Sequence, residues 1–243
     1  MRYLIINKVK FLLRNNNVLD FIMIITIDGP ASAGKGTLAQ SLSEKYGLAY
    51  FDTGMVYRAV GLQLFLDGIA TENEPEAEKA AKALTFPKMM ELSTHQEFRS
   101  NIGGKAASIV AAMPSVRKAL LKMQQDFAKN PVFADGTVAK GAIYDGRDTG
   151  TAICPNADVK LYITASPEVR AERRYKEFLE KGLDISYQDV LEQIKERDDR
   201  DEKRVTSPLR PADDAIIFDT SEYTAAEVLD KVCKIIDSLE EKA

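Results

Sequence analysis

Residues 29–37 read Gly29-Pro30-Ala31-Ser32-Ala33-Gly34-Lys35-Gly36-Thr37. The apolar run Met23–Ile27 precedes this stretch, and a helix-like run, Leu38–Tyr46, follows it. A strand, a glycine-rich turn and a helix in that order form the context that a phosphate-binding loop needs. Backbone N–H groups in such a turn converge on phosphate oxygens, and the positive end of the following helix adds to the attraction. We therefore expect Lys35 to reach the phosphates of a nucleotide and Thr37 to lie near Mg²⁺, as a direct ligand or through water.

Composition narrows the class of protein. The chain has 243 residues, of which 45% are hydrophobic, so it fits one large domain or a core with small inserts. The formal charge of −4 argues against broad binding to nucleic acid. Cys154 and Cys233 are far apart, fit no metal or redox spacing and, without a secretion signal, suggest a reducing compartment. We expect a cytoplasmic protein without a membrane partner, since no apolar run reaches the roughly 18–20 residues that span a bilayer.

Residues 1–22 differ from the rest of the chain. They contain four basic side chains, three consecutive asparagines and short apolar stretches between them. Three interpretations stay open: translation that begins at Met23, a short helix packed on the outside of the domain, or a targeting segment. A cleavable secretory signal fits poorly, because charges interrupt every apolar stretch. We treat 1–22 as an N-terminal extension and 23–243 as the functional domain.

Strand and helix patterns alternate along the domain. Strands are expected at 23–27, 48–52, 141–144, 159–164 and 215–219, with weaker candidates at 132–134 and within 85–98. Helices are expected at 36–46, 55–67, 72–84, 105–112, 116–129, 167–180, 187–201 and 225–239. This alternation predicts an α/β protein, with a central parallel five-stranded sheet between two layers of helices.

Two polar motifs directly follow predicted strands, where an α/β protein binds its ligand. The first is Asp52-Thr53-Gly54-Met55-Val56-Tyr57-Arg58, in which Thr53 and Arg58 could hold a second phosphate. A helix N-cap and a solvated arginine are the plainer interpretations of these two residues. The second is Asp145-Gly146-Arg147-Asp148-Thr149-Gly150-Thr151, in which Arg147 could bind phosphate in a bidentate way. A polar turn is its alternative, and the similar Ala134–Thr137 stretch, which lacks the arginine, is interpreted as a turn.

Basic residues also gather late in the chain. Arg170, Arg173 and Arg174 are spaced so that one helix face carries all three. Residues 196–204 form a run of charges in which Arg197, Asp201 and Arg204 share one stripe. A solvent-facing helix with internal salt bridges explains such a run by itself. Together the two groups suggest a basic lid, which would exclude water from a phosphoryl transfer.

The order of these motifs resembles that of bacterial cytidylate kinases, over about Ile24 to Lys231. The specific matches are Ile27-Asp28-Gly29-Pro30 with Gly34-Lys35-Gly36-Thr37, the Asp52–Arg58 motif, Asp145-Gly146-Arg147-Asp148 with Gly150-Thr151, Lys195–Asp201 and Pro208–Ala215. Glycine after the P-loop lysine is also closer to nucleoside monophosphate kinases than to GTPases. The resemblance implies transfer of the γ-phosphate of ATP to CMP or dCMP in pyrimidine nucleotide metabolism, with Mg²⁺. It further implies a monomer, with an NMP-binding insert at about 71–130 and a lid at about 170–204.

Site residues follow from the same resemblance. Lys35, Arg147, Arg170 and Arg174 would be catalytic, and Gly29–Thr37 would bind ATP, with the Pro208–Pro211 loop beside the adenine. The residues that would bind CMP are Thr53, Arg58, Ser108, Arg117, Asp145, Arg147, Asp148, Arg197, Asp201 and Arg204. Ser108 and Arg117 match positions that read cytosine, and Asp148 and Arg204 would join them.

Three alternatives stay open. Another nucleoside monophosphate kinase would act on UMP or AMP. A nucleotide-dependent regulator would bind ATP or GTP without a small acceptor, although no Asn-Lys-x-Asp guanine-reading motif occurs. A small-metabolite kinase, such as one for shikimate, would share the P-loop but not the cytosine-reading positions.

Overall fold

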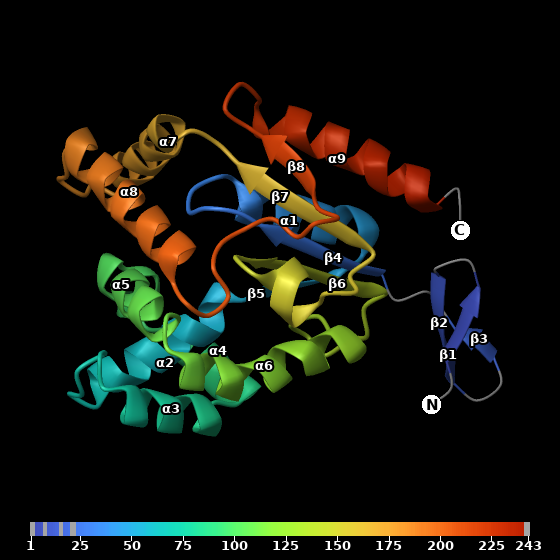
Figure 1. Cartoon of the computed structure of the whole chain (residues 1–243), viewed down its shortest axis with the longest axis horizontal. Helices are drawn as coiled ribbons and strands as arrows, with labels where there is room; N and C mark the ends of the chain where they lie inside the picture. The colour runs from blue at the N-terminus through green and yellow to red at the C-terminus, as the bar shows by residue number, and fades with distance from the viewer. Residues whose placement is uncertain (1–2, 7–8, 15–16, 20–22, 241–243) are drawn as a thin grey trace.

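The computed structural model describes residues 3–6, 9–14, 17–19 and 23–240. A parallel five-stranded sheet lies at its centre with helices on both faces, which confirms the predicted fold (Figure 1). The strands are β4 (Met23–Asp28), β5 (Ala49–Asp52), β6 (Gly141–Gly146), β7 (Val159–Thr164) and β8 (Ile216–Asp219). Their order across the sheet is β5-β6-β4-β7-β8. The loops that leave β4 and β6 therefore lie side by side at the carboxyl edge, where α/β proteins bind ligands.

Alternating side chains of β4 supply both faces of the sheet. Ile25 and Ile27 are fully buried in one cluster with α1 (Lys35–Tyr46) and α9 (Ala225–Glu240). Ile24 packs on the opposite cluster, which holds residues of α2 (Gly54–Leu66). Each fully buried isoleucine stabilises the fold by about 1.5–3 kcal/mol. Two separate apolar layers thus fix the central strand and, with it, the start of the phosphate loop.

Helices fill the stretch between α2 and β6. They are α3 (Glu74–Ala83), α4 (Phe86–Ser93), the short 3-10 helix η1 (Gln96–Arg99), α5 (Asn101–Val110) and α6 (Pro114–Lys129). The expected strand within 85–98 is therefore wrong. Thr85 Oγ1 accepts a hydrogen bond of 3.3 Å from the Lys88 N–H, and Pro87 lies in the first turn, so both residues start a helix. Met89 and Leu92 bury the inner face of that helix.

The Gly103-Gly104 pair lies inside α5, whereas the sequence predicts that this helix begins at residue 105. α5 begins at Asn101, because the Ser100 hydroxyl accepts a 3.3 Å hydrogen bond from the Gly103 N–H. A Cβ at Gly103 would lie 2.3 Å from the carbonyl oxygen of Glu97, so close packing explains this glycine. Val132 forms only an isolated bridge with Val138, so the weaker strand candidate at 132–134 is wrong too. The turn expected near Asp135 is confirmed by its 2.9 Å bond from the Thr137 N–H.

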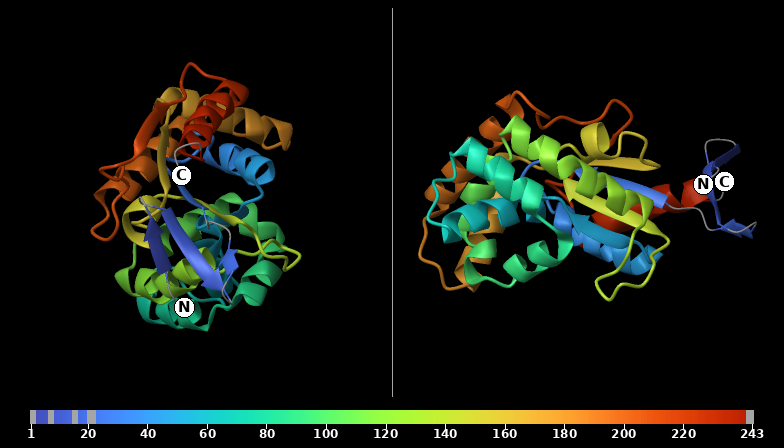
Figure 2. Two further views of the ribbon diagram at one scale, coloured as in Figure 1. Left: turned by 90° about the vertical axis from the view of Figure 1, so that its right-hand side faces the viewer. Right: turned by 90° about the horizontal axis from the view of Figure 1, so that it is seen from below.

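A helical pair forms one end of the molecule (Figures 1 and 2). It consists of α7 (Pro167–Glu180) and α8 (Tyr187–Lys203), in the region where the sequence predicts a lid. Five buried side chains join the two helices in an apolar cluster of their own: Ala171, Phe178, Val190, Leu191 and Ile194. In Figure 1 this pair lies next to α5, at the end where β4 and β6 terminate. The short π-helical turn η2 (Thr149–Ile153) and the strand β7 connect β6 to the pair.

The described parts of the N-terminal extension form a small sheet of their own. β1 (Tyr3–Ile6), β2 (Val9–Arg14) and β3 (Asn17–Leu19) pair antiparallel in sequence order. The interpretation of the extension as a short helix is therefore wrong for these residues, and the rest of 1–22 lies outside the described residues. None of the described helices is long and apolar enough to cross a bilayer.

Candidate active site

The phosphate loop runs from the end of β4 to the first turn of α1. Gly29 has φ of 144°, and a Cβ there would lie 1.9 Å from the carbonyl oxygen of Ile163 on β7, so only glycine fits. Gly34 has φ of 92° and precedes Lys35, the first residue of α1. The Lys35 ammonium donates a 2.8 Å hydrogen bond to the carbonyl oxygen of Pro30. The loop thus folds around its own lysine at a helix N-terminus, which is the arrangement that binds anions.

Burial shifts the charges beside this lysine. The Lys35 ammonium lies 3.8 Å from a carboxylate oxygen of Asp145, and Tyr50 donates a 3.4 Å hydrogen bond to the same carboxylate. Burial lowers the pKa of Lys35, nearby Arg147 lowers it further, and Asp145 opposes both. Burial likewise raises the pKa of Asp145, against the effect of Lys35. An anionic ligand in the loop would favour the charged form of the lysine, because opposite charge raises a base's pKa.

Asp28, the last residue of β4, ties the phosphate loop to the loop after β6. One carboxylate oxygen accepts hydrogen bonds from the Thr149 N–H at 2.8 Å and from its hydroxyl at 2.9 Å. The other oxygen accepts from the Gly150 N–H at 2.8 Å. The side chain is buried, and burial raises its pKa despite these bonds. Asp28 therefore fixes the segment that carries Arg147 and Asp148 against the phosphate loop.

Thr53 and Arg58 flank the same edge of the sheet. Thr53 stands at the N-cap of α2 but makes no capping hydrogen bond, so the N-cap interpretation is wrong. Its hydroxyl instead donates a 2.8 Å bond to the carbonyl oxygen of Asp145, while Asp52 accepts from the first helical N–H at 2.8 Å. Arg58 donates a 2.8 Å bond to the Phe98 carbonyl, which joins α2 to η1. Burial lowers the pKa of Arg58, with Asp52 acting against it.

A second group lies between the insert helices and the loop after β6. The guanidinium of Arg117 donates to the carboxylate of Asp148 and, at 3.1 Å, to the carbonyl oxygen of Ala111. Its centre lies 5.3 Å from the ring centroid of Tyr57, a cation–π contact. Arg204 comes within 3.8 Å of Asp148. Three of the residues expected to read a base, Arg117, Asp148 and Arg204, are therefore brought together, and all three side chains are nearly buried.

Asp201 connects this group to the phosphate end. It accepts a 2.9 Å hydrogen bond from Arg147 Nε and lies 3.9 Å from Arg204. Burial acts to raise the pKa of Asp201, but Arg147, Arg197 and Arg204 hold it below its usual value. Burial and Arg147 lower the pKa of Arg197 to about 10, and Arg197 Nε has no hydrogen-bond partner among the described residues. Three arginines, Arg147, Arg197 and Arg204, therefore surround the single carboxylate of Asp201, and this excess of positive charge suits a phosphate-bearing ligand.

The lid arginines do not act as one group. Arg170 is buried and binds Asp198 of α8 with hydrogen bonds of 3.0 and 2.6 Å, while a third bond of 3.3 Å reaches the carbonyl oxygen of Ala31 in the phosphate loop. Arg173 donates to the hydroxyl and carbonyl of Thr220 instead. The three arginines lie on one helix at the expected spacing, but each has different partners.

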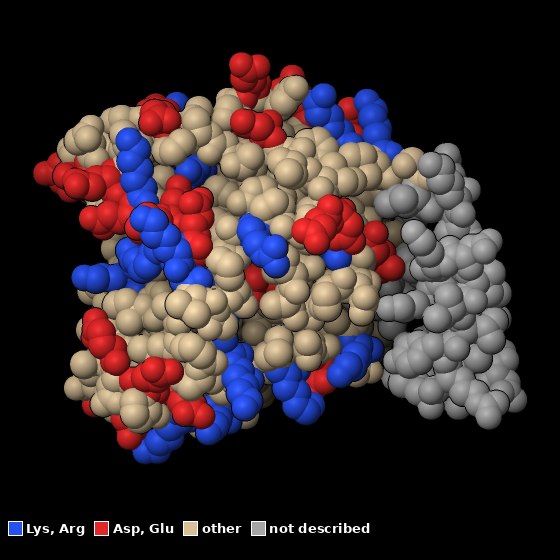
Figure 3. All heavy atoms as spheres, in the orientation of Figure 1, with Lys and Arg blue, Asp and Glu red and all other residues tan. Residues whose placement is uncertain are grey.

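Arg174 is the lid arginine that stays partly exposed. It pairs with Glu177 at 2.8 Å and stacks 4.3 Å from the Phe178 ring centroid. It is also close enough to lower the pKa of both Arg58 and Arg197, although burial is the larger cause in each. Arg174 therefore contributes positive charge toward the centre of the site. Figure 3 shows basic side chains gathered between the lid helices and α5.

The comparisons with known proteins decide the family. The family model described as cytidylate kinase matches residues 25–238. The chain belongs to the cytidylate kinase family. The cytidylate kinase of Paramagnetospirillum magneticum is 47% identical over 215 residues, which cover 88% of this chain and 98% of the relative. That of Xanthobacter autotrophicus is 44% identical over 216 residues, with 89% and 98% coverage.

A solved structure shares the fold of this cytidylate kinase family member. The crystal structure of an uncharacterized protein from Eubacterium ventriosum aligns with a TM-score of 0.50 and 12% identity, covering 89% of this chain and 99% of that one. At that identity the likeness concerns the fold alone. It supports the three-layer architecture and says nothing about the substrate.

The donor set near the phosphate loop fits the Mg²⁺ that a cytidylate kinase would use with ATP. The Thr37 hydroxyl is exposed in the first turn of α1 and makes no hydrogen bond with any described residue. A Cβ on the neighbouring Gly36 would lie 3.5 Å from a carboxylate oxygen of Asp145, so hard oxygen donors flank the loop. No cluster of three protein carboxylate, histidine or cysteine ligands occurs among the described residues. Mg²⁺ does not need one, since it binds through one or two protein oxygens, water and substrate phosphates.

Sequence reasoning missed four residues that shape this cytidylate kinase site. Asp28 and Tyr57 stand inside quoted motifs but received no role, and Asp198 and Arg200 were absorbed into a run of charges. The sequence did hold a signal for Asp28, because it is an aspartate at the carboxyl end of a predicted buried strand, where α/β proteins bind ligands. Arg200 donates a 3.1 Å hydrogen bond to the hydroxyl of Ser108, so the expected base reader Ser108 faces α8.

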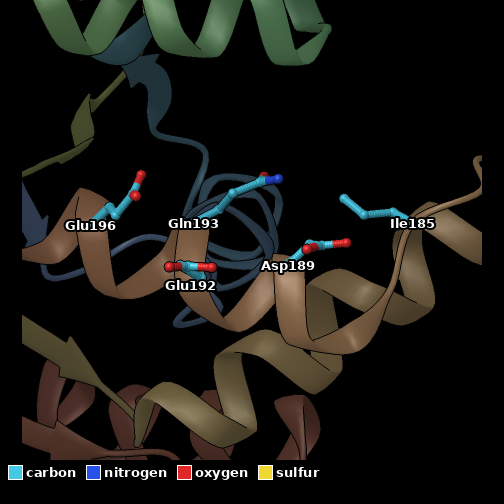
Figure 4. A pocket seen from close by; sticks show the side chains of 5 residues that line it. All are labelled: Ile185, Asp189, Glu192, Gln193 and Glu196. Atoms are coloured by element: carbon cyan, nitrogen blue, oxygen red, sulfur yellow. The ribbon is translucent and has the colours of Figure 1, made fainter.

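Two surface hollows are lined by residues other than the arginines described above. The hollow in Figure 4 is lined by Ile185, Asp189, Glu192, Gln193 and Glu196, all from α8 and the residues before it. Three carboxylates make that hollow repel a nucleotide phosphate, so it is not the ATP or CMP site. A second depression is lined by Lys160, Arg210 and Asp214, among others. It borders the Pro208–Pro211 loop, whose role beside adenine stays a prediction.

Proposed function

We propose that the protein transfers the γ-phosphate of ATP to CMP or dCMP and releases ADP with CDP or dCDP. Membership of the cytidylate kinase family over residues 25–238 supports this reaction. The contacts of Arg147 are the observation that carries it. Arg147 directly precedes Asp148, which contacts Arg117 and Arg204. Arg147 also donates a 2.9 Å hydrogen bond to Asp201, and its charge lowers the pKa of Lys35. These contacts support a role for Arg147 between a bound monophosphate and the phosphate loop.

The residues suit a transfer in which positioning and charge dominate. The acceptor is already a phosphate, so no strong general base is needed, and the chain's single histidine is no obstacle. Lys35 and the loop amides would hold the phosphates of ATP. Arg58, Arg147 and Arg197 would align the acceptor phosphate and neutralise charge as the transfer proceeds. Arg170 and Arg174 would bring the lid over the reacting groups, excluding water that would otherwise hydrolyse ATP.

Base selection would fall to the group around Asp148. Arg117, Asp148 and Arg204 offer donors and acceptors in a nearly buried setting, where an unpaired polar edge of the wrong base is strongly disfavoured. Ser108 would join them from α5, and Asp145, Thr53 and Asp201 would complete the acceptor site. Thr37, with oxygens of the substrate, would hold Mg²⁺, which supplies charge neutralisation on the phosphates when bound. Monomeric state and cytoplasmic location stay predictions from the sequence.

An acceptor panel tests the proposed reaction. ADP release would be measured with ATP and Mg²⁺ against CMP, dCMP, UMP, AMP, GMP and no acceptor. We expect CMP and dCMP to exceed the other acceptors by at least about 100-fold in kcat/KM, since a site built for one polar edge discriminates strongly. Turnover led by UMP or AMP would favour a different monophosphate kinase. Turnover that does not depend on an acceptor would reject a monophosphate kinase altogether.

The Lys35→Ala variant tests the phosphate loop within the same assay. We expect transfer to fall below detection while circular dichroism and thermal unfolding show a folded protein, because burial already disfavours the ammonium that is removed. The matched control is Lys45→Ala, which removes an exposed lysine from the same helix. A Lys35→Ala protein with wild-type turnover would contradict the assignment of this loop to ATP.

A further inference from the structure

One polar contact crosses directly from the lid helices to the insert helices. Arg200 Nη1, on α8, donates a 3.1 Å hydrogen bond to Ser108 Oγ, on α5. Both residues are half-buried. Among the hydrogen bonds and ion pairs between described residues of α7–α8 and α3–α6, no other direct link is found. The lid helix and the insert therefore meet at the hydroxyl of a residue expected to contact the base.

The charges around Arg200 direct it to this hydroxyl. Arg197, Lys203 and Arg204 lie three or four residues from Arg200, so three of its four neighbours at helical spacing are cations, and the fourth, Glu196, forms no ion pair with it. Although acidic residues are frequent in α8, Arg200 forms no ion pair with any described carboxylate, whereas Lys203 on the same helix pairs with Asp199. A guanidinium that uses a neutral hydroxyl as its acceptor forms a charge-assisted bond, which is stronger than a neutral one.

The bond restricts the Ser108 hydroxyl. A serine hydroxyl has one hydrogen to donate and two lone pairs, and it normally rotates to suit its partner. When Arg200 donates to one lone pair, the O–H must point in another direction, so fewer orientations of the hydroxyl donor and of the remaining lone pair stay available to a ligand. At ring positions 3 and 4, cytosine presents an acceptor and a donor, whereas uracil presents a donor and an acceptor. A rotating hydroxyl can suit either base, but a held one favours only one of them.

We propose that Arg200 is a positioning residue that acts through Ser108 to couple closure of the lid to selection of cytosine over uracil in the acceptor. This inference rests on the proposed function, since it concerns the base of the monophosphate acceptor. Arg200 itself needs no contact with the substrate. Closure brings α8 to α5, the guanidinium fixes the hydroxyl, and discrimination is therefore complete only in the closed state that carries out the transfer.

The first test compares two substitutions on α8 that each remove one positive charge. Arg200→Met deletes the donor but keeps an apolar stem, and Lys203→Met removes an exposed lysine as the control. The measured quantity is the ratio of kcat/KM for CMP to kcat/KM for UMP. We expect Arg200→Met to lower this ratio about tenfold, as expected for the loss of one charge-assisted hydrogen bond. Lys203→Met should leave it unchanged, and Arg200→Lys should recover part of it.

A double-mutant cycle separates positioning from general damage. Ser108→Ala should lower the same ratio, and Arg200→Met added to Ser108→Ala should change it no further, because the bond is already absent. Thermal unfolding verifies that each variant is folded, and Arg200→Leu, which also lacks a donor, replaces Arg200→Met if the latter is not. An equal further fall in the double variant would overturn the inference, as would a wild-type ratio near one. Wild-type protein without CMP turnover would instead overturn the proposed function, whereas a selective wild type with an unaffected Arg200→Met ratio would overturn this inference alone.

Discussion

Replacing the buried carboxylate of Asp28 by an amide should loosen the loop that carries Arg147. Asp28 accepts three hydrogen bonds of 2.8, 2.9 and 2.8 Å, two from Thr149 and one from Gly150. Asparagine has the same shape but only one acceptor oxygen, so its NH₂ group must face one of the two backbone N–H groups. That N–H is then buried without a partner.

The magnitude follows from these three bonds. An unsatisfied buried donor destabilises a protein by about 1–3 kcal/mol, and bonds to a charged acceptor are stronger than those to a neutral one. Burial raises the pKa of Asp28, so the neutral amide recovers part of this loss by avoiding the desolvation of a charge. We expect a net loss of about 2 kcal/mol, which lowers Tm by roughly 4–8 °C for a chain of this size.

Activity should fall as well, because the shifted loop holds Arg147 and Asp148. A misplacement approaching 1 Å can lower the rate about 100-fold, so we expect kcat/KM for CMP to fall about 10- to 100-fold in Asp28→Asn. The assays are urea unfolding and steady-state kinetics on the same preparation. Asp135→Asn is the matched control, since Asp135 also accepts from a threonine N–H and hydroxyl, at 2.9 and 2.7 Å, but in an exposed turn. An Asp28→Asn protein as stable and active as this control would refute the reasoning.

Four further outcomes are expected. Gly29→Ala should destabilise the fold by about 3 kcal/mol or more, measured by urea unfolding, because its Cβ would overlap the Ile163 carbonyl and φ is 144°; unchanged stability would contradict the close approach. Arg147→Ala should lower kcat about 100-fold or more. The same variant should also make the free energy of unfolding fall less steeply at acid pH. In the wild type the lowered pKa of Asp201 stabilises the fold above the usual carboxylate pKa, and this stabilisation is lost as pH falls through the lowered pKa. Burial raises the pKa of Cys154 to about 12, so iodoacetamide at pH 8 should not alkylate it before unfolding, as mass spectrometry would show. Removal of Mg²⁺ with EDTA should abolish transfer and be reversed by added Mg²⁺, whereas EDTA-resistant turnover would contradict a metal requirement.

Much of the core could be predicted because its signals are local. The apolar run at Met23–Ile27 and the β-branched run at Val159–Thr164 form strands by their own composition. The predicted bounds of Pro167–Glu180 agree with α7, since Ser166 caps it with a hydroxyl that accepts from the Val169 N–H. These elements depend on residues within a few positions of one another, which a single sequence displays.

The contacts that build the site are long-range and could not be predicted in that way. Thr53 looks like an N-cap in the sequence, but its hydroxyl bonds a carbonyl 92 residues away. In the sequence Arg170 looks like one of three equivalent arginines. Of the three, however, only Arg170 donates hydrogen bonds to Asp198 and to the phosphate loop. Such pairings depend on which loops the order of the strands brings together. The types of charged residue in the sequence do not by themselves reveal that order.

The separate apolar cluster of the lid has a thermodynamic consequence. Phe178, Val190 and Ile194 stay packed together however the α7–α8 pair is placed, so a pivot of the pair would expose little additional apolar surface. The contacts that such a pivot breaks are mainly polar, such as those of Arg147 with Asp201 and of Arg200 with Ser108. A heat-capacity change follows exposed apolar area, and charge pairs respond to ionic strength. Opening and closing of this lid should therefore vary little with temperature and strongly with salt concentration.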